Sequence, residues 1–367
     1  MAQVLAGDPR EGRQARLRDA LRSVGVDALL IASRANTRYL TGFSGSSSLL
    51  VVSHSDTLLI TDFRYRAQAK AEAGAVAQVE IEGTSLWTRL WDVFPRLHGI
   101  ERVGFESAHM VHADFERLAD AGKRWSWRAM ANAVEGLRLQ KDEGELACIR
   151  AAVAIAERAL EVTIPAMRAG RTELDVGAEL EHQLRGLGSE AHPFETIVAS
   201  GERSALPHAR CTARELRAGD LLIVDFGAVS GGYCSDITRT FVVGRAGDDQ
   251  REAYGIVLEA NATASAAVRA GMRGRDADAL ARDCIERRGL GPEFGHSLGH
   301  GIGLEVHEAP RLARTIDAPL MERAVVTIEP GVYREGWGGV RIEDDVYLSP
   351  EGPVVLTTFP RELHELV

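Results

Sequence analysis

The chain has 367 residues, of which 45% are hydrophobic and 26% are charged. This length predicts two or three domains, and the composition is that of an ordinary globular protein rather than a disordered or fibrous one. Acidic residues outnumber basic residues by 53 to 43, which gives a formal charge of −10. Such a balance excludes the basic surface that nucleic acid or an anionic membrane attracts, so we expect neither among the partners.

The cysteines are widely spaced and form no C-x-x-C pair; they are Cys148, Cys211, Cys234 and Cys284. This spacing argues against a disulfide framework and against a thiolate zinc site. The N-terminal segment becomes charged before an apolar signal segment could form, and no run of about 18 apolar residues occurs anywhere. These features together predict a cytoplasmic protein.

The first 134 residues predict a small α/β domain. Apolar spacing predicts a helix over 13–24, and a buried strand over 27–33 follows it. Two β-rich runs, 49–53 and 56–62, flank a pair of turn-forming residues and predict a hairpin. Helix-like and strand-like segments then continue to alternate, which is typical of an α/β domain.

A change of pattern near residue 135 predicts a second domain over 135–367. Between Leu146 and Leu160 apolar residues recur at spacings of three and four, which predicts a long helix with one apolar face. No proline-rich or serine-rich linker marks the boundary, so its position depends on the change of pattern alone.

The second domain contains a faint internal repeat. Arg-Ala-Gly at 168–170, followed by Asp175, recurs 101 positions later at 269–271, followed by Asp276. In the first copy Thr172 and Asp175 have the spacing of a capping box, which predicts the start of a helix. Each copy then continues into an apolar run that ends in an acid, and into a second strand that also carries an acid.

Four carboxylates therefore lie within or beside apolar strands; they are Asp225, Asp236, Glu329 and Glu343. A carboxylate in such a place is costly unless it is paired or binds a cation, because it loses its hydration shell. Any one of them could simply cap a turn at the end of a strand. Four at equivalent places in two repeats favour a shared site instead.

Between these acids, segment 294–310 places His296, His300 and His307 among several glycines. Histidines four residues apart could be half-buried side chains on one helix face. The glycines argue against a helix and predict an irregular segment whose backbone closely approaches a ligand. Their spacing does not match a dinucleotide-binding loop.

Four carboxylates and one imidazole form an oxygen-rich, thiol-free set of ligands. This set suits two hard or borderline divalent ions, with manganese as the first choice and cobalt or zinc after it. Two carboxylates would bridge the ions, and water between ions about 3.5–4 Å apart becomes a nucleophile near neutral pH. The predicted reaction class is metal-assisted hydrolysis.

Five motifs occur in a fixed order: DFG at 225–227, YCSDITRT at 233–240, GHGIGLEVHE at 299–308, TIEPG at 327–331 and VRIED at 340–344. They resemble the pita-bread metallopeptidases, a family that includes aminopeptidase P, prolidase (Xaa-Pro dipeptidase) and, more distantly, methionine aminopeptidase. The resemblance implies an α+β fold, with a creatinase-like α/β domain over 1–134 and a pita-bread catalytic domain over 135–367. It also implies a homodimer, in which the segment with Asn36, Arg38 and Tyr39 lies near the active site.

The same resemblance implies the role of each site residue. The metal ligands would be Asp225, Asp236, His300, Glu329 and Glu343. Asp236 and Glu343 would be the bridging pair, and Glu329 would also be the general base that takes a proton from the bridging water.

Three histidines and two further residues complete the implied site. His307 would stabilise the tetrahedral intermediate, and His208 would assist the scissile peptide and the leaving amine. His296 would line the pocket for the proline ring. Arg341 would contact the carboxylates of the site and Tyr333 would follow the Glu-Pro-Gly turn, although both could equally serve in packing behind it.

The favoured function is hydrolysis of the Xaa-Pro bond in dipeptides, and a proline-containing di- or oligopeptide is the expected partner. This bond is a tertiary amide without an N–H, so its hydrolysis calls for a dedicated pocket for the ring. An aminopeptidase P that acts on longer Xaa-Pro peptides is the alternative, and an arginine that holds the substrate carboxylate, such as Arg34, Arg38 or Arg64, would decide between them. A non-catalytic binding module and a metal-free, creatinase-type hydrolase are further alternatives. Measurement of the bound metal would distinguish both from the metallopeptidase.

Overall fold

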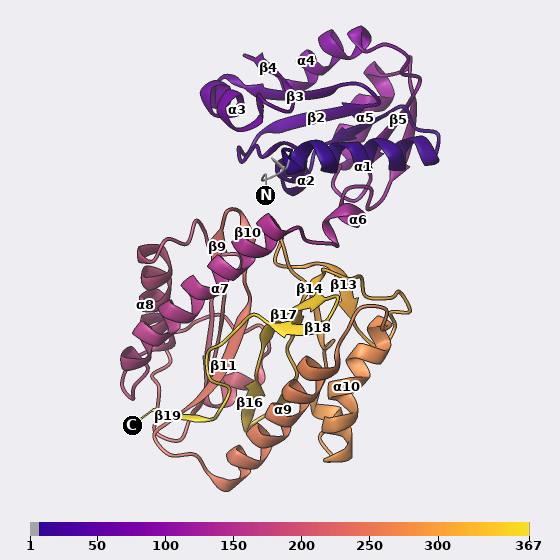
Figure 1. Cartoon of the computed structure of the whole chain (residues 1–367). Helices are drawn as coiled ribbons and strands as arrows, with labels where there is room; N and C mark the ends of the chain where they lie inside the picture. The colour runs from indigo at the N-terminus through magenta and orange to yellow at the C-terminus, as the bar shows by residue number, and fades with distance from the viewer. Residues whose placement is uncertain (1–6, 367) are drawn as a thin grey trace, which may run out of the picture. The chain divides into compact units, whose positions relative to one another are not determined.

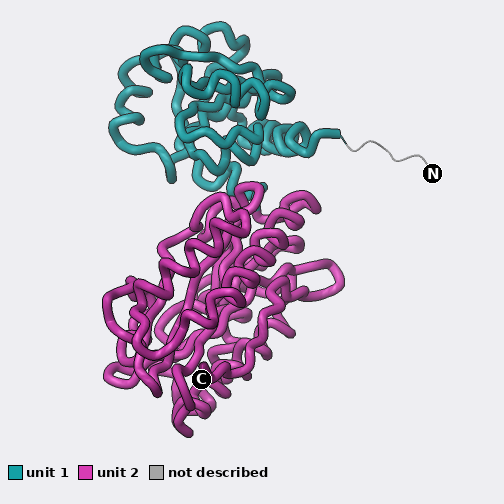
Figure 2. Tube along the Cα trace, turned by 90° about the vertical axis from the view of Figure 1, so that its left-hand side faces the viewer, with its two compact units in different colours: residues 1–138 teal, residues 139–367 magenta. Residues whose placement is uncertain are grey.

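The computed structural model describes residues 7–366 of the chain. The chain divides into two compact units, Met1–Arg138 and Leu139–Val367, which Figure 2 shows in separate colours. This division lies after Arg138, and the domain boundary between residues 134 and 135 stays a prediction. Each unit has its own sheets and its own apolar core.

Unit 1 is built on a six-stranded mixed sheet in the order β4-β3-β2-β1-β5-β6. Its elements are α1 Pro9–Ser23, β1 Ala28–Ile31, α2 Arg34–Thr41, β2 Ser48–Ser53, β3 Thr57–Asp62, α3 Arg66–Ala73, β4 Gln78–Glu82, α4 Leu86–Val93, β5 Arg102–Glu106, α5 His112–Ala121, β6 Ser126–Met130 and α6 Glu135–Arg138. The predicted first helix, first strand and β2–β3 hairpin are confirmed. Helix α1 begins earlier than expected because Asp8 caps it and proline suits its first position.

Unit 2 contains a four-stranded sheet, β19-β11-β8-β7, and a five-stranded sheet, β13-β12-β14-β17-β18. Its elements are α7 Glu143–Thr163, α8 Glu173–Gly186, β7 Ile197–Ser200, β8 Leu221–Phe226, β9 Val229–Ser230, β10 Tyr233–Cys234, β11 Ile237–Val243, α9 Asp248–Ala267, α10 Gly274–Arg287, β12 Gly299–Gly301, β13 Glu308–Leu312, β14 Val325–Ile328, β15 Gly331–Arg334, β16 Gly338–Arg341, β17 Asp344–Ser349, β18 Gly352–Val355 and β19 His364–Leu366. The long helix predicted over 146–160 is confirmed as α7.

The internal repeat is visible as two similar halves of unit 2. Helices α7 and α8 pack on the four-stranded sheet, and α9 and α10 form the core with strands of the five-stranded sheet (Figure 1). Gly170 and Gly271 both adopt left-handed backbone conformations, with φ of 84° and 82°. Thr172 and Asp175 form the predicted capping box at the start of α8. The repeat in the sequence is therefore a repeat in the structure.

In each half an antiparallel strand pair brings two acids to one end. Strands β8 and β11 pair in a register that sets Asp225 opposite Thr238, and Asp236 immediately precedes β11. In the second half β14 and β17 pair, and Glu329 and Glu343 lie just beyond the same end of that pair. Because strand ends are fixed by their ladders, this arrangement holds the acids on rigid backbone.

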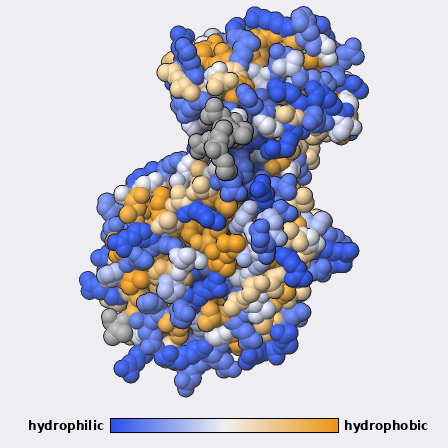
Figure 3. Space-filling model, in the orientation of Figure 1, coloured by the Kyte–Doolittle hydropathy of each residue, from blue (hydrophilic) through white to orange (hydrophobic). Residues whose placement is uncertain are grey.

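On the face that Figure 3 shows, hydrophilic side chains predominate, and apolar side chains form patches on both units, the broadest over the middle of unit 2. Individual exposed apolar residues, such as Phe63 and Leu206, are ordinary for a globular protein. No helix within residues 7–366 is both long and apolar enough to cross a membrane. No disulfide joins the cysteines within residues 7–366.

Lys141 and Glu308 form a buried ion pair in unit 2, with Nζ 2.7 Å from Oε1 and side chains only 1% and 6% exposed. We expect Lys141→Met to lower the free energy of unfolding by about 3 kcal/mol, because it leaves a buried carboxylate without its cation. Denaturant unfolding followed by circular dichroism measures this loss.

Arg158 and Glu161 on α7 form an exposed pair and provide the control. Arg158→Met should change the free energy of unfolding by less than about 0.5 kcal/mol. Equal losses in the two variants would contradict a stabilising role for the buried pair.

Candidate active site

One cavity of about 450 Å³ in unit 2 collects most of the residues that the sequence singled out. It is lined by all five predicted metal ligands, together with Arg341 and the three histidines His208, His296 and His307. Tyr333 lies behind this wall, where it contacts His296 and Arg341. Residues from both halves of the repeat therefore meet at one place.

The ring of His300 presents a lone pair to carboxylates. Its Nδ1 lies 3.1 Å from the carbonyl oxygen of Gly301, which only accepts, so Nδ1 carries the proton and Nε2 does not. Burial lowers the pKa of His300 to about 4, which keeps the ring neutral. Its Nε2 is 3.5 Å from Glu329 Oε1 and 3.7 Å from Asp236 Oδ2. Three acceptors that face one another in this way fit a cation between them.

The buried carboxylates also favour a bound cation. Burial, together with the charges of neighbouring acids, raises the pKa of Asp236 and of Glu343 well above the ordinary values. Burial raises the pKa of Glu329 to about 8. Asp225 Oδ1 is buried and has no hydrogen-bond partner among residues 7–366. Ligand atoms of Asp236, His300 and Glu343 lie within 4.8 Å of one another, so the residues present fit divalent cations.

Arg341 supplies the nearest fixed positive charge. Its Nη2 donates to Asp225 Oδ2 at 2.6 Å and its Nε donates to Thr238 Oγ1 at 3.1 Å. Thr238 in turn lies 2.5 Å from Glu343 Oε2, to which its hydroxyl donates. The expected contact between Arg341 and the carboxylates is present, and it holds Asp225 in one orientation.

A chain of hydrogen bonds links Arg341 to His296 through Tyr333. Arg341 Nη1 donates to the Tyr333 hydroxyl oxygen at 2.7 Å, and that oxygen lies 3.0 Å from His296 Nε2. His296 Nδ1 faces the carbonyl of Ser297 at 2.8 Å and must donate, so Nε2 accepts from Tyr333. Burial raises the pKa of Tyr333 to about 12 and lowers that of His296 to about 4. Both side chains therefore remain neutral near pH 7.

His208 and His307 come from loops rather than from strands. His208 lies in the segment between β7 and β8, and His307 immediately precedes β13. Both are exposed at the rim of the cavity, and the ring of His307 packs at 4.3 Å against that of His300. They can therefore approach a bound substrate from outside the carboxylate cluster.

The glycines around His300 serve a different purpose from the one expected. His300 lies on the short strand β12, and a Cβ at Gly299 would come within 2.0 Å of the Thr327 carbonyl oxygen. A Cβ at Gly301 would come within 2.1 Å of the Ala309 carbonyl oxygen. Apart from β12, the segment 294–307 is irregular and contributes to the cavity lining, as expected, but Gly299 and Gly301 allow neighbouring strands rather than a ligand to approach closely.

The structure adds one residue that sequence reasoning missed. Arg311 lines the cavity, is exposed, and makes no side-chain hydrogen bond or ion pair with any residue in 7–366. It lies opposite His300 in the β12–β13 register, a placement that no local pattern reveals. Of the arginines considered earlier, Arg64 is held by Asp62 at 2.7 Å. Asn36 is buried in unit 1 and donates to Glu106.

Comparison with known proteins identifies the family. Residues 147–350 match the model of metallopeptidase family M24, and residues 13–140 match that of the creatinase/prolidase N-terminal domain. The chain belongs to metallopeptidase family M24. The family confirms the predicted pita-bread fold, the creatinase-like N-terminal domain and the assignment as a hydrolase that uses divalent metal ions.

Relatives within family M24 match over nearly the whole chain. A peptidase of Bacillus subtilis named YqhT, described as uncharacterized, is 41% identical over 95% of this chain and 98% of its own. The structure of a Bacillus anthracis Xaa-Pro dipeptidase has a TM-score of 0.94 and 39% identity, covering 97% of this chain and all of its own. The structure of a Thermotoga maritima X-Pro aminopeptidase has a TM-score of 0.89 and 40% identity, covering 96% of this chain and 99% of its own.

The raised pKa values predict how pH acts on this M24 chain without its metal. A carboxyl whose pKa is raised on folding stabilises the fold below its unfolded pKa, and that contribution is lost as pH rises through the folded pKa. The stability of chelator-treated protein should therefore fall from about pH 5 to about pH 9, the range that contains the raised pKa of Glu329. Scanning calorimetry at several pH values measures this fall.

Addition of manganese should remove most of that decline, since bound cations favour the ionised carboxylates. The difference in melting temperature between loaded and stripped protein should therefore widen as pH rises. A difference that is constant or narrows with pH would contradict cation binding at these acids.

Proposed function

We propose that the chain is an Xaa-Pro dipeptidase that uses two divalent metal ions, with manganese as the first choice and cobalt or zinc as alternatives. The observation that carries this proposal is the cluster of mutually facing acceptors from both halves of unit 2. In this proposal the ions would be held by Asp225, Asp236, His300, Glu329 and Glu343. The dipeptidase and aminopeptidase names of similar structures support the preference for proline.

Bound divalent ions would lower the pKa of a water molecule and polarise the scissile carbonyl. Glu329 would accept the proton of that water on a carboxylate oxygen. Its pKa of about 8 without cations reflects burial, and a carboxyl with such a pKa can take up and release a proton near neutral pH. Arg341, which already pairs with Asp225, would offset part of the negative charge of the carboxylates.

His307 and His208 would act on the outer side of the substrate. From the cavity rim, His307 would donate to the oxygen that becomes negative in the tetrahedral intermediate. His208 would interact with the scissile peptide and the leaving imino group. His296, kept neutral and oriented by Tyr333, would line the pocket for the proline ring, beside the apolar side chains of Ile197 and Pro207.

Arg311 gives a physical reason to prefer dipeptides. An unpaired guanidinium at a cavity of about 450 Å³ suits a carboxylate close to the scissile bond, as in a dipeptide. A longer peptide would carry a neutral amide at the same distance. We therefore place substrate length under the control of Arg311 rather than of Arg34, Arg38 or Arg64.

The homodimer and the cytoplasmic location are part of the same proposal. The homodimer is supported by the family resemblance alone, and sedimentation analysis measures it directly. Cysteines without a disulfide among residues 7–366 fit a reducing compartment. A non-catalytic binding module remains the alternative of another class, and protein that contains manganese yet cleaves no Xaa-Pro peptide would support it.

We expect Glu329→Gln to lower turnover of Ala-Pro by about 100-fold or more, because it removes the general base while retaining size. Global stability should change little. Steady-state assays with manganese, together with thermal melts, measure both effects.

His307→Ala provides the comparison, since this ring lies outside the proposed set of ligands. It should slow turnover while elemental analysis shows unchanged manganese. Full activity of Glu329→Gln would contradict its role as base, and loss of metal from His307→Ala would move His307 into the ligand set.

The substrate-length proposal predicts faster cleavage of Ala-Pro than of Ala-Pro-Ala. Arg311→Met should reduce kcat/KM for Ala-Pro by about 10-fold or more, through loss of a charge-assisted contact, and should change that for Ala-Pro-Ala far less. Side-by-side assays on chelator-stripped protein supplied with manganese, cobalt or zinc also identify the preferred metal.

Arg314 is the matched control, because it pairs with Glu286 outside the cavity lining. Arg314→Met should leave both rates unchanged. Equal losses on the two substrates in Arg311→Met would contradict recognition of the dipeptide carboxylate, and preferred cleavage of Ala-Pro-Ala would favour the aminopeptidase alternative.

A further inference from the structure

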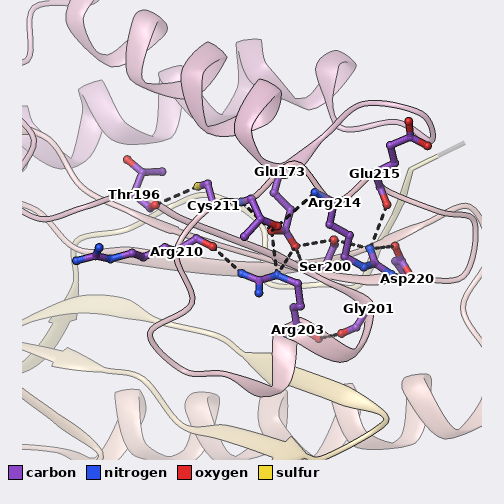
Figure 4. Close-up of polar contacts among 12 residues, drawn as sticks. Glu173, Thr196, Ser200, Gly201, Arg203, Arg210, Cys211, Arg214, Glu215 and Asp220 are labelled. Carbon is purple, nitrogen blue, oxygen red and sulfur yellow. Dashed lines mark hydrogen bonds and ion pairs between the residues drawn. The ribbon is translucent and has the colours of Figure 1, made fainter.

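The carboxylate of Glu173 joins the two ends of the loop between β7 and β8. Glu173 is the first residue of α8 and is fully buried. The segment 201–212 leaves β7, carries His208 along the cavity, and returns to Glu173. Figure 4 shows the side chains that converge on this carboxylate.

Donors from both ends of the loop bind the two oxygens of Glu173. Before the loop, the backbone N–H and the hydroxyl of Ser200 each donate to Oε1 at 2.8 Å. After the loop, Thr212 donates to Oε2 from its backbone N–H at 3.1 Å and from its hydroxyl at 2.7 Å. One buried group therefore fixes the distance between the two ends.

Arg203 extends this contact into the loop. Its Nε donates to Glu173 Oε2 at 3.1 Å, and its Nη2 donates to the carbonyl oxygen of Arg210 at 2.6 Å. Arg210 is two residues from His208 and also lines the cavity. The guanidinium of Arg203 thus spans the loop from its base to the side that lines the cavity.

A second arginine supports the same end of β7. Arg214 Nη1 donates to the hydroxyl of Ser200 and to Asp220 Oδ2, each at 2.6 Å (Figure 4). The Ser200 hydroxyl therefore accepts from Arg214 while it donates its own proton to Glu173. Asp220 thus accepts from Arg214, and the carboxylate of Glu173 is the acceptor that the two ends of the loop share.

Helix formation alone does not require a glutamate at this position. Asp175 already completes the capping box of α8, and the equivalent position in the second half is Gly274, at the start of α10. A Cβ at Gly274 would come within 2.4 Å of the Arg311 carbonyl oxygen, so there the backbone of β13 packs directly on the helix. In the first half the side chain of Glu173 extends from the start of α8 and contacts both ends of the loop 201–212.

We propose that Glu173 is a positioning residue that holds the loop 201–212 so that His208 faces the substrate. This inference rests on the proposed function, in which His208 assists the scissile peptide. Because every contact of Glu173 described above comes from a donor, even Glu173→Gln would turn an amide N–H toward donors and release the loop.

A double-mutant cycle with His208→Ala tests the proposal on metal-loaded, full-length protein with Ala-Pro. Glu173→Gln should reduce kcat/KM by about 10-fold to 100-fold when His208 is present, because small misplacements of a reacting group cost about this much. In the His208→Ala background the same change should cost less than about 2-fold. Equal losses in the two backgrounds would overturn the proposal, as would full activity of Glu173→Gln.

Hydrogen exchange without substrate provides a readout that does not depend on activity. Glu173→Gln should speed exchange in 201–212 and leave bound manganese unchanged. Unaltered exchange in this segment would overturn the proposal. Wild-type protein that does not cleave Ala-Pro would contradict the proposed function, and the exchange result would still support or overturn the fixing of the loop.

Two further variants guard against a general loss of structure. Asp175→Asn changes an acid in the same first turn that has no contact with the loop, and it should leave activity and exchange unchanged. Thr212→Val removes one of the hydrogen bonds to Glu173 at nearly constant volume. It should lower kcat/KM for Ala-Pro by less than Glu173→Gln does, and only when His208 is present. An equal reduction of kcat/KM in the His208→Ala background would count against the proposal.

Discussion

Mutual repulsion among four carboxylates is the constraint on which the rest of this structure depends. Asp225, Asp236, Glu329 and Glu343 line one cavity, and burial with their neighbours' charges raises the pKa of three of them. Arg341 offsets only part of the negative charge, through its contact with Asp225. A site of this kind is stable in its ionised form only with cations bound, so metal binding and folding stability are linked.

The fold opposes this repulsion by fixing the backbone from which the acids project. Buried Asn261 on α9 donates to the carbonyl oxygens of Ile328 and Ile342, the residues that precede Glu329 and Glu343. Buried Arg239 on β11 donates at 2.6 Å to the carbonyl oxygen of Glu343, and so ties the two halves together. The backbone at Glu329 and Glu343 is thus held by contacts that do not depend on whether the carboxyls are ionised.

The outer wall of the site is built differently. The proposed metal ligands lie on or beside strands, whereas His208 and His307 lie on loops that ion pairs hold from behind. Lys141 with Glu308 holds the residue next to His307, and Glu173 with Arg203 spans the loop of His208. Loops on a rigid scaffold can change without disturbing the residues that the strands hold in place.

The sequence by itself determined the elements and the four acids, because helix and strand periodicity, the capping box and the alternation of apolar runs with acids are local patterns. It also showed the two halves, through a repeat of short motifs. Only the tertiary structure decided which groups face one another. The approach of His300 Nε2 to Asp236 and Glu329, the place of Arg311 at the cavity and the contacts of Glu173 all depend on residues far away in the chain, such as Ser200 and Thr212, 27 and 39 positions from Glu173. The close backbone approaches at Gly299 and Gly301 also escape a local pattern, because the strands that meet there lie side by side only after folding.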